Sequence, residues 1–324
     1  MAAALTNTVD WRRHTITSAA LRGNPLGDPH ERDLWVWSPP DQSRRYPSVY
    51  VLHAHMRSAA SWFNVEPFER SYPEAIAALA PEAVVVLVDG WTSVGGSQWI
   101  DSEGIGRYGT YLQEEVVQFV DASYPTDGTR GLQGKSSGGY GALVNALARP
   151  DLFSAVAAHA ADALFEVTLA HGFPAAARML AERGITSMAE FWESFSGLNE
   201  AGNALLVELG SCALAFGNGE LPFDPETAAV LPELWEPWLA HDPIRLIEQD
   251  GPTAAGLRAI WIDAGGRDEY YLDRAAFALR RAIRRAGFPE ERLHFELFPG
   301  GHRGLSDRYP LSLAFLVERL SMSL

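Results

Sequence analysis

A serine flanked by glycines is the feature of this sequence that most constrains its fold. The motif Gly134-Lys135-Ser136-Ser137-Gly138 follows a strand-like run, Gly131–Gly134, and leads into a helical run, Gly138–Ala148. A serine held between a strand and a helix sits in a strained turn, where neighbours without side chains avoid steric clashes. We therefore predict that Ser136 is a nucleophile at the carboxyl edge of a parallel sheet. A glycine-rich packing turn is the alternative interpretation.

The rest of the chain alternates two kinds of run. Short apolar runs predict strands, several of them covered on both faces, and runs with apolar residues at spacings of three and four predict helices. Together with the serine motif, this alternation predicts an α/β-hydrolase fold, a mostly parallel sheet flanked by helices. An antiparallel edge hairpin is expected within residues 25–47. We expect strands at Leu34–Trp37, Ser48–His53, Ala83–Asp89, Gly131–Gly134, Phe153–His159, Ala259–Asp263 and Leu293–Phe298, and helices at Tyr108–Tyr124, Gly138–Ala148, Asp273–Ala286 and Leu311–Leu320.

One segment, from Asp162 to Asp242, breaks the alternation. It has no strand pattern, but helical runs occur at Ala175–Arg183 and Met188–Phe195. We therefore predict a core of residues 1–161 and 243–324, and a helical cap insertion of residues 162–242. Large aromatic side chains are dense in this insertion. They either pack its own small core or line a substrate cleft, and for the second case Trp192 and Trp235 are the candidate substrate-binding residues.

A serine nucleophile needs a histidine base that is itself held by a carboxylate. On this fold the acid and the histidine follow the serine in that order, each after a later strand. Asp268 follows the strand-like run Ala259–Asp263, and His302 follows the run Leu293–Phe298. Catalytic groups gather just beyond the carboxyl ends of such strands. We predict a triad of Ser136, Asp268 and His302.

The acid of this triad has two alternatives. Asp263, still inside the strand, and Glu269, next to Asp268, could each take its place, and Asp263 would otherwise cap or brace the loop. For the base there is little competition. The other candidate histidines lie outside the expected loop or within a strand: His14, His30, His171, His241 and His294.

Further residues are expected around the reaction centre. The backbone N–H of Ser137 would face an oxyanion, and the second donor would be the N–H of His55 or Met56, after the strand Ser48–His53. His53 and His55 alternate as metal ligands could, but no carboxylate or cysteine cluster accompanies them, so no metal site is predicted. We also select Trp62, Gln98 and Trp99 for the edge of the cleft, with structural packing as the alternative.

Composition excludes several functions. The formal net charge of -15 disfavours binding to a phosphate backbone, so no nucleic-acid partner is expected. No nucleotide-binding glycine motif is present, and no cofactor is expected. The sequence has no apolar run of membrane-spanning length, no secretory signal at its N-terminus and one cysteine, Cys212, so we expect a cytoplasmic protein that does not bind a membrane.

These motifs resemble the Putative esterase family, whose relatives include S-formylglutathione hydrolase, feruloyl esterases, enterochelin esterases and the antigen 85 mycolyltransferases. The resemblance runs from about Pro47 to Leu320 and is densest at residues 89–99, 114–125, 134–142 and the two loops 263–270 and 300–302. It implies that Ser136, Asp268 and His302 form the triad. Two features depart from the family: His53-Ala54-His55-Met56 stands where many relatives have His-Gly followed by small residues, and the insertion is longer than in compact members.

The resulting functional prediction is a serine carboxylic-ester hydrolase that acts on a small-molecule ester through an acyl-enzyme. Alternatives are an acyltransferase with the same triad, a peptidase and a non-catalytic binding module. The acyl group, the alcohol and the oligomeric state stay open, with a homodimer among the partners considered.

Overall fold

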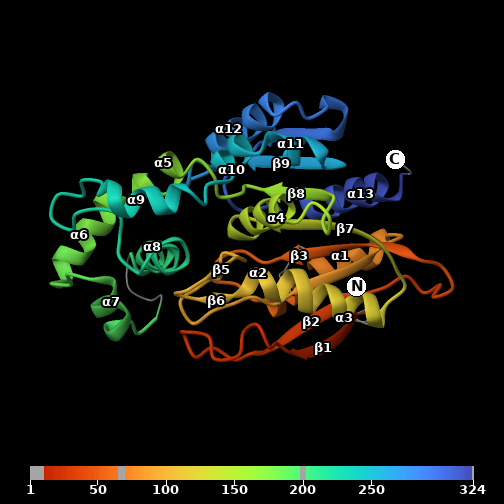
Figure 1. Cartoon of the computed structure of the whole chain (residues 1–324), viewed down its shortest axis with the longest axis horizontal. Helices are drawn as coiled ribbons and strands as arrows, with labels where there is room; N and C mark the ends of the chain where they lie inside the picture. Colours follow the sequence, from red (N-terminus) through yellow and green to blue (C-terminus); the bar gives the residue numbers. More distant parts are fainter. Residues whose placement is uncertain (1–10, 65–69, 198–201, 323–324) are drawn as a thin grey trace, which may run out of the picture.

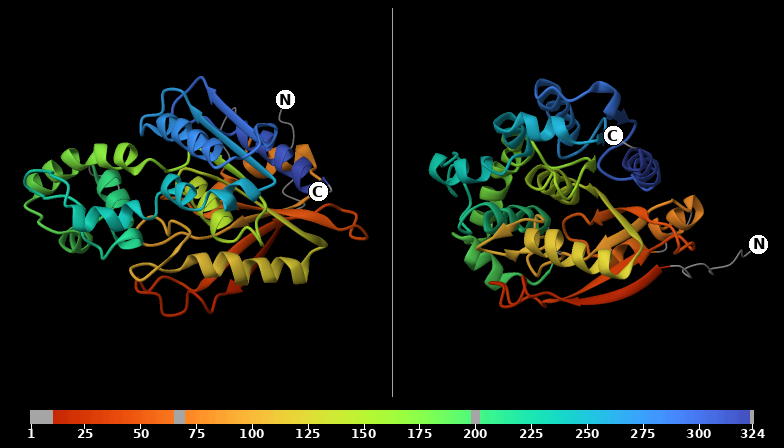
Figure 2. Two further views of the ribbon diagram at one scale, coloured as in Figure 1. Left: turned by 45° about the horizontal axis from the view of Figure 1, so that its top comes forward. Right: turned by 45° about the vertical axis from the view of Figure 1, so that its right-hand side comes forward.

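The computed structural model describes residues 11–64, 70–197 and 202–322. Its main sheet has eight strands in the order β1-β2-β4-β3-β7-β8-β9-β10, and helices cover both faces (Figures 1 and 2). The neighbours from β4 to β10 pair in parallel, and β1 and β2 are antiparallel. This confirms the predicted fold class. The strands are β1 Trp11–Thr17, β2 Glu31–Trp37, β3 Tyr46–Leu52, β4 Val84–Val88, β7 Thr126–Lys135, β8 Ala155–His159, β9 Ala259–Gly265 and β10 Leu293–Phe298, with a separate small pair, β5 Asp101–Ser102 and β6 Gly106–Arg107.

The helices form two layers on the sheet. One layer contains α1 and α13, which pack on each other, and α13 also packs on β3, β7 and β8; the other contains α4 on β7 and β8 and α12 on β9. Side chains alternate along β4, so both faces of the sheet are covered by apolar residues. Val84, Val86 and Val88 belong to one buried apolar cluster, and Val85 and Leu87 belong to the other. The helices of the core are α1 Tyr72–Leu79, α2 Tyr108–Thr110, α3 Val117–Ser123, α4 Ser137–Ala148, α10 Pro243–Gln249, α11 Gly251–Gly256, α12 Leu272–Arg285 and α13 Arg308–Ser321, with short helices η1 Ala59–Phe63, η2 Tyr111–Val116 and η4 Glu290–Arg292.

The edge hairpin differs from the prediction. It is formed by β1 and β2, which pair from Trp11 opposite Trp37 to Thr17 opposite Glu31, so its first strand lies upstream of the expected range 25–47. None of the side chains of β1 is fully buried. An edge strand that buries so little has no continuous apolar run, and this is why the sequence pattern missed it.

Parallel pairing brings the catalytic loops to one edge of the sheet. Leu52 at the end of β3 lies opposite Gly134 of β7, and Lys135 lies opposite His159 at the end of β8. His159 is in turn opposite Asp263 of β9. The loops that leave β3, β7, β8, β9 and β10 therefore meet at one end of the sheet, where ligands bind in open α/β folds.

Between β8 and β9 the described chain is helical apart from one isolated bridge, Phe223 to Val230. We call residues 162–242 the cap segment. Its helices α6 and α7 lie farthest from the sheet, and α8 lies between them and the core (Figure 1). The helices are α5 Phe165–Thr168, η3 Ala170–Gly172, α6 Phe173–Arg183, α7 Met188–Ser194, α8 Asn203–Phe216 and α9 Pro232–Leu239.

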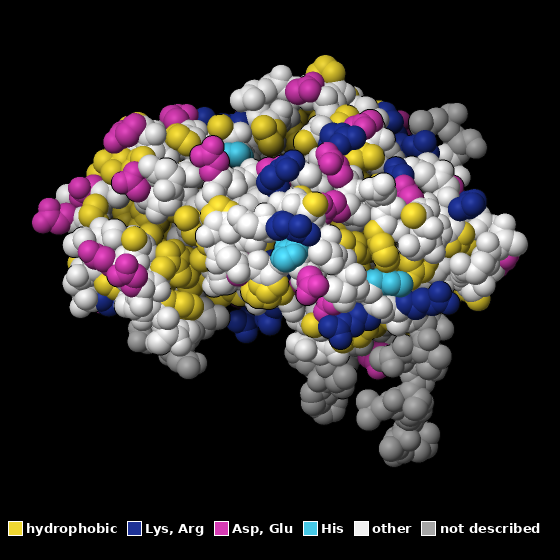
Figure 3. All heavy atoms as spheres, turned by 60° about the horizontal axis from the view of Figure 1, so that its bottom comes forward, with side chains coloured by type: hydrophobic (Ala, Val, Ile, Leu, Met, Phe, Trp, Pro, Cys, Tyr) yellow, Lys and Arg dark blue, Asp and Glu magenta, His cyan; other side chains and the backbone are white. Residues whose placement is uncertain are grey.

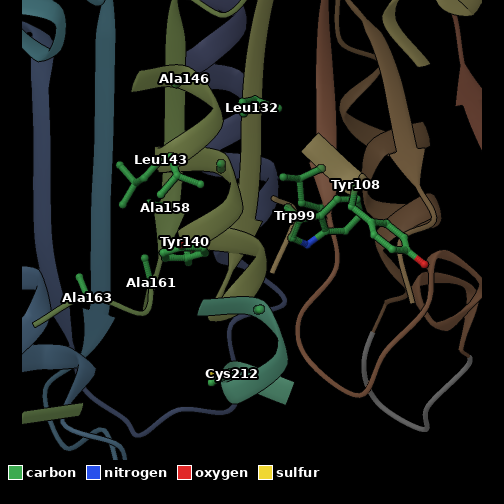
Figure 4. Packing of buried hydrophobic residues seen from close by; sticks show 14 of the residues in the cluster. Trp99, Tyr108, Leu132, Tyr140, Leu143, Ala146, Ala158, Ala161, Ala163 and Cys212 are labelled. Atoms are coloured by element: carbon green, nitrogen blue, oxygen red, sulfur yellow. The ribbon is translucent and has the colours of Figure 1, made fainter. Parts of the chain in front are cut away.

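Helix α8 connects the cap segment to the core. The Ser102 hydroxyl donates to Leu214 O at 3.3 Å, and Ser211 Oγ lies 2.9 Å from His55 Nε2. Figure 4 shows Cys212 of α8 below Tyr140 of α4, with Trp99 on the other side of that helix. None of the helices in the described part of the chain is long and apolar enough to cross a membrane.

The two candidate tryptophans of the cap segment each pack against other aromatic residues of that segment. Trp235 is 7% exposed and lies 5.3 Å from Phe173 and 5.7 Å from Trp238, between ring centroids. Trp192 packs against Phe191 and Phe195 at 5.1 and 5.6 Å. Both tryptophans therefore belong to the cap segment's own core, which was the first of the two interpretations left open by the sequence.

Candidate active site

Ser136 lies in the turn between β7 and α4. Its φ of 55° and ψ of -126° place it in a backbone region that is strained for a residue with a side chain. The two motif glycines are required by contact: a Cβ on Gly134 would lie 2.1 Å from Gly138 O, and one on Gly138 would lie 2.3 Å from Leu52 O. Larger residues at either position would push the serine out of place. The turn thus holds the Ser136 side chain at the end of the sheet, where it is half-buried.

His302 and Asp268 pair beside this turn. His302 Nδ1 lies 2.9 Å from Asp268 Oδ2, and the Asp268 side chain is fully buried. Its other oxygen accepts hydrogen bonds from the N–H groups of Tyr270 at 2.9 Å and Leu272 at 3.4 Å. A carboxylate held in this way keeps the Nδ1 proton on the imidazole, which leaves Nε2 as the basic nitrogen.

The two alternative acids are occupied elsewhere. Glu269 Oε2 accepts the backbone N–H of His302 at 2.7 Å, so it supports the loop and does not contact the ring. Asp263 lies 2.6 Å from His159 Nδ1 and accepts from Trp261 Nε1 at 2.9 Å and Arg308 Nε at 3.0 Å. Burial opposes its ionisation, but these donors outweigh burial and lower the pKa of Asp263.

Asp263, His159 and Ser312 form a second serine–histidine–aspartate chain, with Ser312 Oγ 2.8 Å from His159 Nε2. All three residues are completely buried. No substrate can reach this chain, so it braces β8, β9 and α13 and takes no part in a reaction.

Two carboxyl groups that the sequence analysis did not select lie next to Ser136. The Ser136 hydroxyl donates to Asp162 Oδ1 at 3.4 Å. Burial raises the pKa of Asp162 to about 8, and Glu208 of α8 contributes further to this shift. Burial also raises the pKa of Glu208 to about 7. Asp162 follows the carboxyl end of β8, so the rule that found Asp268 and His302 could have found it as well. Glu208 lies within a helix and carried no such signal.

The loop after β3 is held by its histidine side chains. His53 Nε2 accepts the N–H of Gly90 at 3.0 Å, and burial lowers the pKa of both His53 and His55 to about 4, so both rings are neutral at neutral pH. Met56 N–H donates to Gly95 O at 2.7 Å and is therefore engaged. In the described residues no hydrogen bond is found from the N–H of His55 or of Ser137. Of the two candidates for the second oxyanion donor, this geometry favours His55 over Met56.

The three candidates for the cleft edge separate into two groups. Trp99 is 2% exposed, donates from Nε1 to His53 O at 3.2 Å and packs on Gly90 and Gly141. Gln98 is buried against Cys212 of α8, with Nε2 3.7 Å from Sγ. Both are therefore packing residues, and Trp99 also borders a cavity that it shares with Tyr140 and Asn145 of α4. Trp62, in contrast, lines a cavity next to Lys135.

The described residues contain no group of three or more histidine, cysteine, aspartate or glutamate side chains arranged to hold a metal ion. The residues that carry the candidate chemistry are Ser136, His302 and Asp268.

Comparison with known proteins gives the family. The model of the family described as Putative esterase matches residues 29–303 of this chain. The chain belongs to this family. It is an esterase by family, in agreement with the resemblance inferred from its motifs. No curated protein matches its sequence.

Solved structures of esterases have the same fold as this family member. A ferulic acid esterase is 17% identical with a TM-score of 0.59, and the alignment covers 96% of this chain and 97% of that chain. S-formylglutathione hydrolase from Agrobacterium tumefaciens is also 17% identical with a TM-score of 0.59, at 96% and 95% coverage. Enterochelin esterase from Shigella flexneri is 17% identical with a TM-score of 0.55, covering 98% of this chain and 59% of its own.

Proposed function

We propose that this esterase hydrolyses a carboxylic ester through an acyl-enzyme on Ser136, with His302 as base and Asp268 as the residue that orients it. The observation that carries the proposal is the 2.9 Å contact between His302 Nδ1 and the buried Asp268 carboxylate, next to the strained turn of Ser136. A fixed imidazole beside a serine on such a turn is the arrangement that acyl transfer to serine requires.

The steps follow from the roles of these groups. His302 Nε2 takes the Ser136 proton as Ser136 Oγ attacks the ester carbonyl. The N–H groups of Ser137 and His55 donate to the oxyanion that develops. His302 then gives its proton to the leaving alcohol as the C–O bond breaks. In the second step His302 takes a proton from water as the water attacks the acyl carbon, and it returns this proton to Ser136 Oγ as the bond from Oγ to the acyl group breaks and the acid leaves. The Ser136 hydroxyl must leave Asp162 for His302, and catalytic hydrogen bonds often shorten only when substrate binds.

The cap segment would cover one side of the reaction centre around Ser136. Glu208 and Ser211 of α8 face Asp162 and His55, so the cap supports the oxyanion loop and shapes the entrance, while its tryptophans serve its own packing. The residues of the cleft then determine which small-molecule ester is bound and whether an alcohol can replace water as the acceptor.

The test is the chemical reactivity of one side chain. A fluorophosphonate probe should label Ser136 in the wild-type enzyme, and Ser136→Ala should lose both the label and the hydrolysis of p-nitrophenyl acetate while keeping its far-UV circular dichroism spectrum. His302→Ala should lose activity to a similar extent. Labelling of a different serine, or full activity in either variant, would refute the assignment. The ratio of free acid to the new ester formed with an added alcohol then distinguishes a hydrolase from an acyltransferase.

A further inference from the structure

A cavity of about 230 Å³ lies beside the reaction centre, on the side of the sheet edge formed by the loop after β3. Lys135, the residue before Ser136, lines it, as do His53 and Ala54, the two residues before the proposed oxyanion donor His55. A group bound in this cavity would therefore contact residues that are adjacent in sequence to Ser136 and to His55.

The cavity has an unusual charge for this protein. Arg57, Arg70 and Lys135 line it, and no aspartate or glutamate does so among the described residues. The chain as a whole has 41 acidic against 26 basic side chains, so three cations with no acid among the described lining residues differ from the composition of the chain. Within the described ranges none of the three is within ion-pair distance of a carboxylate.

Lys135 is the most deeply placed of these cations. Arg57 and Arg70 are exposed, whereas Lys135 is half-buried. Burial lowers the pKa of Lys135 to about 8, and Arg57 and Arg303 lower it further, while Asp268 and Asp162 raise it. An ammonium that has lost part of its hydration and has cationic neighbours gains most from an anionic ligand.

Three aromatic side chains, Trp62, Tyr72 and Tyr309, also line the cavity. Trp62 lies 4.9 Å from Tyr72 and 5.0 Å from Tyr309, between ring centroids, and the indole N–H of Trp62 is buried without a hydrogen-bond partner in the described structure. Tyr72 is fixed by a 2.8 Å hydrogen bond from its hydroxyl to Gln133 Oε1. The wall therefore supplies flat apolar surface.

The opposite side of Ser136 has the opposite charge. Asp162 and Glu208 face the nucleophile from the cap side. The cap segment carries thirteen acidic and only two basic residues, and acidic side chains are frequent at the cap end of the face in Figure 3 whereas lysine and arginine are spread over the core. An anionic group is therefore attracted on the side of Lys135, and above about pH 8, where Asp162 is ionised, it is also repelled on the cap side.

We infer that the cavity lined by Lys135, Arg57 and Arg70 is a subsite for an anionic group, a carboxylate or a phosphate, of the ester substrate. That the bound molecule is an ester rests on the proposed function. That it is anionic rests on the cavity alone. The substrate is then an ester whose acyl or alcohol part ends in an anion, seated against Trp62 and held away from Asp162.

The experiment compares esters that differ only in charge. On the acyl side, p-nitrophenyl hemiglutarate is paired with p-nitrophenyl pentanoate. On the alcohol side, 4-acetoxybenzoate is paired with 4-acetoxybenzamide, and 4-acetoxyphenyl phosphate tests the phosphate. The wild type should prefer at least one anionic member in kcat/KM by about 10-fold or more, the size of one charge-assisted hydrogen bond. The pair that gives the preference identifies which part of the substrate carries the anion.

Variants of the cavity assign the preference to its residues. Arg57→Gln and Lys135→Met should each reduce the preference by about 10-fold and leave turnover of the neutral ester within about 2-fold. Arg57→Lys should retain most of it. Arg281→Gln, the same charge change at an exposed site on α12, is the matched control and should change nothing. The preference should also fall as the pH rises through about 8, where Lys135 loses its proton, and this fall should be absent in Lys135→Met.

Binding to Ser136→Ala, measured by calorimetry with the same charged and neutral esters, separates the two proposals. If the wild type hydrolyses none of the esters but Ser136→Ala binds the anionic ones preferentially, and Arg57→Gln abolishes that preference, the esterase mechanism is refuted and the subsite is kept. Hydrolysis of all esters with no charge preference, or a preference that Arg57→Gln and Lys135→Met leave intact, would refute the subsite and keep the mechanism.

Discussion

The proposed nucleophile of this esterase, Ser136, lies next to a titrating carboxyl group. Asp162 accepts the Ser136 hydroxyl, and its pKa of about 8 makes it neutral below that pH and ionised above it. An ionised carboxylate holds a hydroxyl more strongly than a neutral acid does, and it would then compete with His302 for the Ser136 proton. Because Glu208 titrates close by, the apparent pKa belongs to the pair.

We predict that kcat/KM for a neutral ester falls as the pH rises through about 8 and that Asp162→Asn removes this fall, since an amide does not titrate. Lys135→Met should keep it, because the lysine charge does not act on a neutral ester. The measurement is the pH dependence of p-nitrophenyl acetate hydrolysis after subtraction of the uncatalysed rate. An unchanged alkaline limb in Asp162→Asn would rule out this role.

The two aspartates of the β9 region have separable roles. Asp268→Asn should lower kcat/KM by about 10⁴-fold with little loss of stability, because it leaves the imidazole in the wrong tautomer. Asp263→Asn should retain most of the activity but lower the free energy of unfolding by about 3–5 kcal/mol, since it removes the partner of the buried Arg308 and His159 contacts. Urea unfolding and steady-state kinetics on both variants provide the test, and the reverse ranking in activity would assign the acid to Asp263.

The elements of the fold differ in how clearly the sequence announced them. The central strands were recognisable over their buried parts, as in β4, where all five residues are buried, whereas the exposed first half of β7 was not predicted. The long helix predicted at Tyr108–Tyr124 is present as consecutive helical pieces from Tyr108 to Ser123. The edge strand β1 was missed for the opposite reason, since it buries little. Helix α8 was missed too, because it is apolar on nearly all sides and has little periodicity to detect.

The site was predictable where it depends on position after a strand and not where it depends on packing. Asp268 and His302 were selected because they follow β9 and β10. Trp99 was selected by the same rule, yet its ring fills the space that Gly90 and Gly141 leave. A sequence shows that a residue follows a strand but not whether a distant glycine makes room for it. The same limit applies to Met56, whose N–H is engaged by Gly95.

The aromatic residues of the cap segment provide a prediction at the level of the element. Trp235→Ala should lower the free energy of unfolding by about 3–5 kcal/mol, because it opens a cavity between Phe173 and Trp238. The ranking of ester substrates should stay nearly unchanged. Urea unfolding followed by kinetics on short, long and aromatic acyl esters measures both. A changed ranking with wild-type stability would place Trp235 in the substrate cleft instead.

At the scale of the whole molecule, charge is unevenly distributed. The cap segment holds thirteen of the 41 acidic residues and two of the 26 basic ones, so most of the net charge of -15 lies in a quarter of the chain. Like charges gathered on one part of a protein repel and destabilise its compact state, and salt reduces that repulsion within a Debye length of about 8 Å at physiological ionic strength. The acidity that helps to orient a charged substrate at the active site therefore has a cost in stability.

We predict that the cap segment limits the thermal stability of this esterase at low salt. Raising NaCl from 10 to 200 mM shortens the Debye length from about 30 Å to about 7 Å. The Tm should then rise by a few degrees, since about 1 kcal/mol shifts Tm by roughly 2–4 °C in large domains. The double variant Glu182→Gln/Glu193→Gln, at two exposed cap positions, should raise the Tm at low salt and reduce its response to salt. Glu291→Gln/Glu318→Gln makes the same charge change at exposed positions of the core and should have the smaller effect. Differential scanning calorimetry with sucrose as an uncharged control measures the response. A Tm that is independent of salt, or a larger gain from the core variant than from the cap variant, would show that repulsion within the cap does not set the stability.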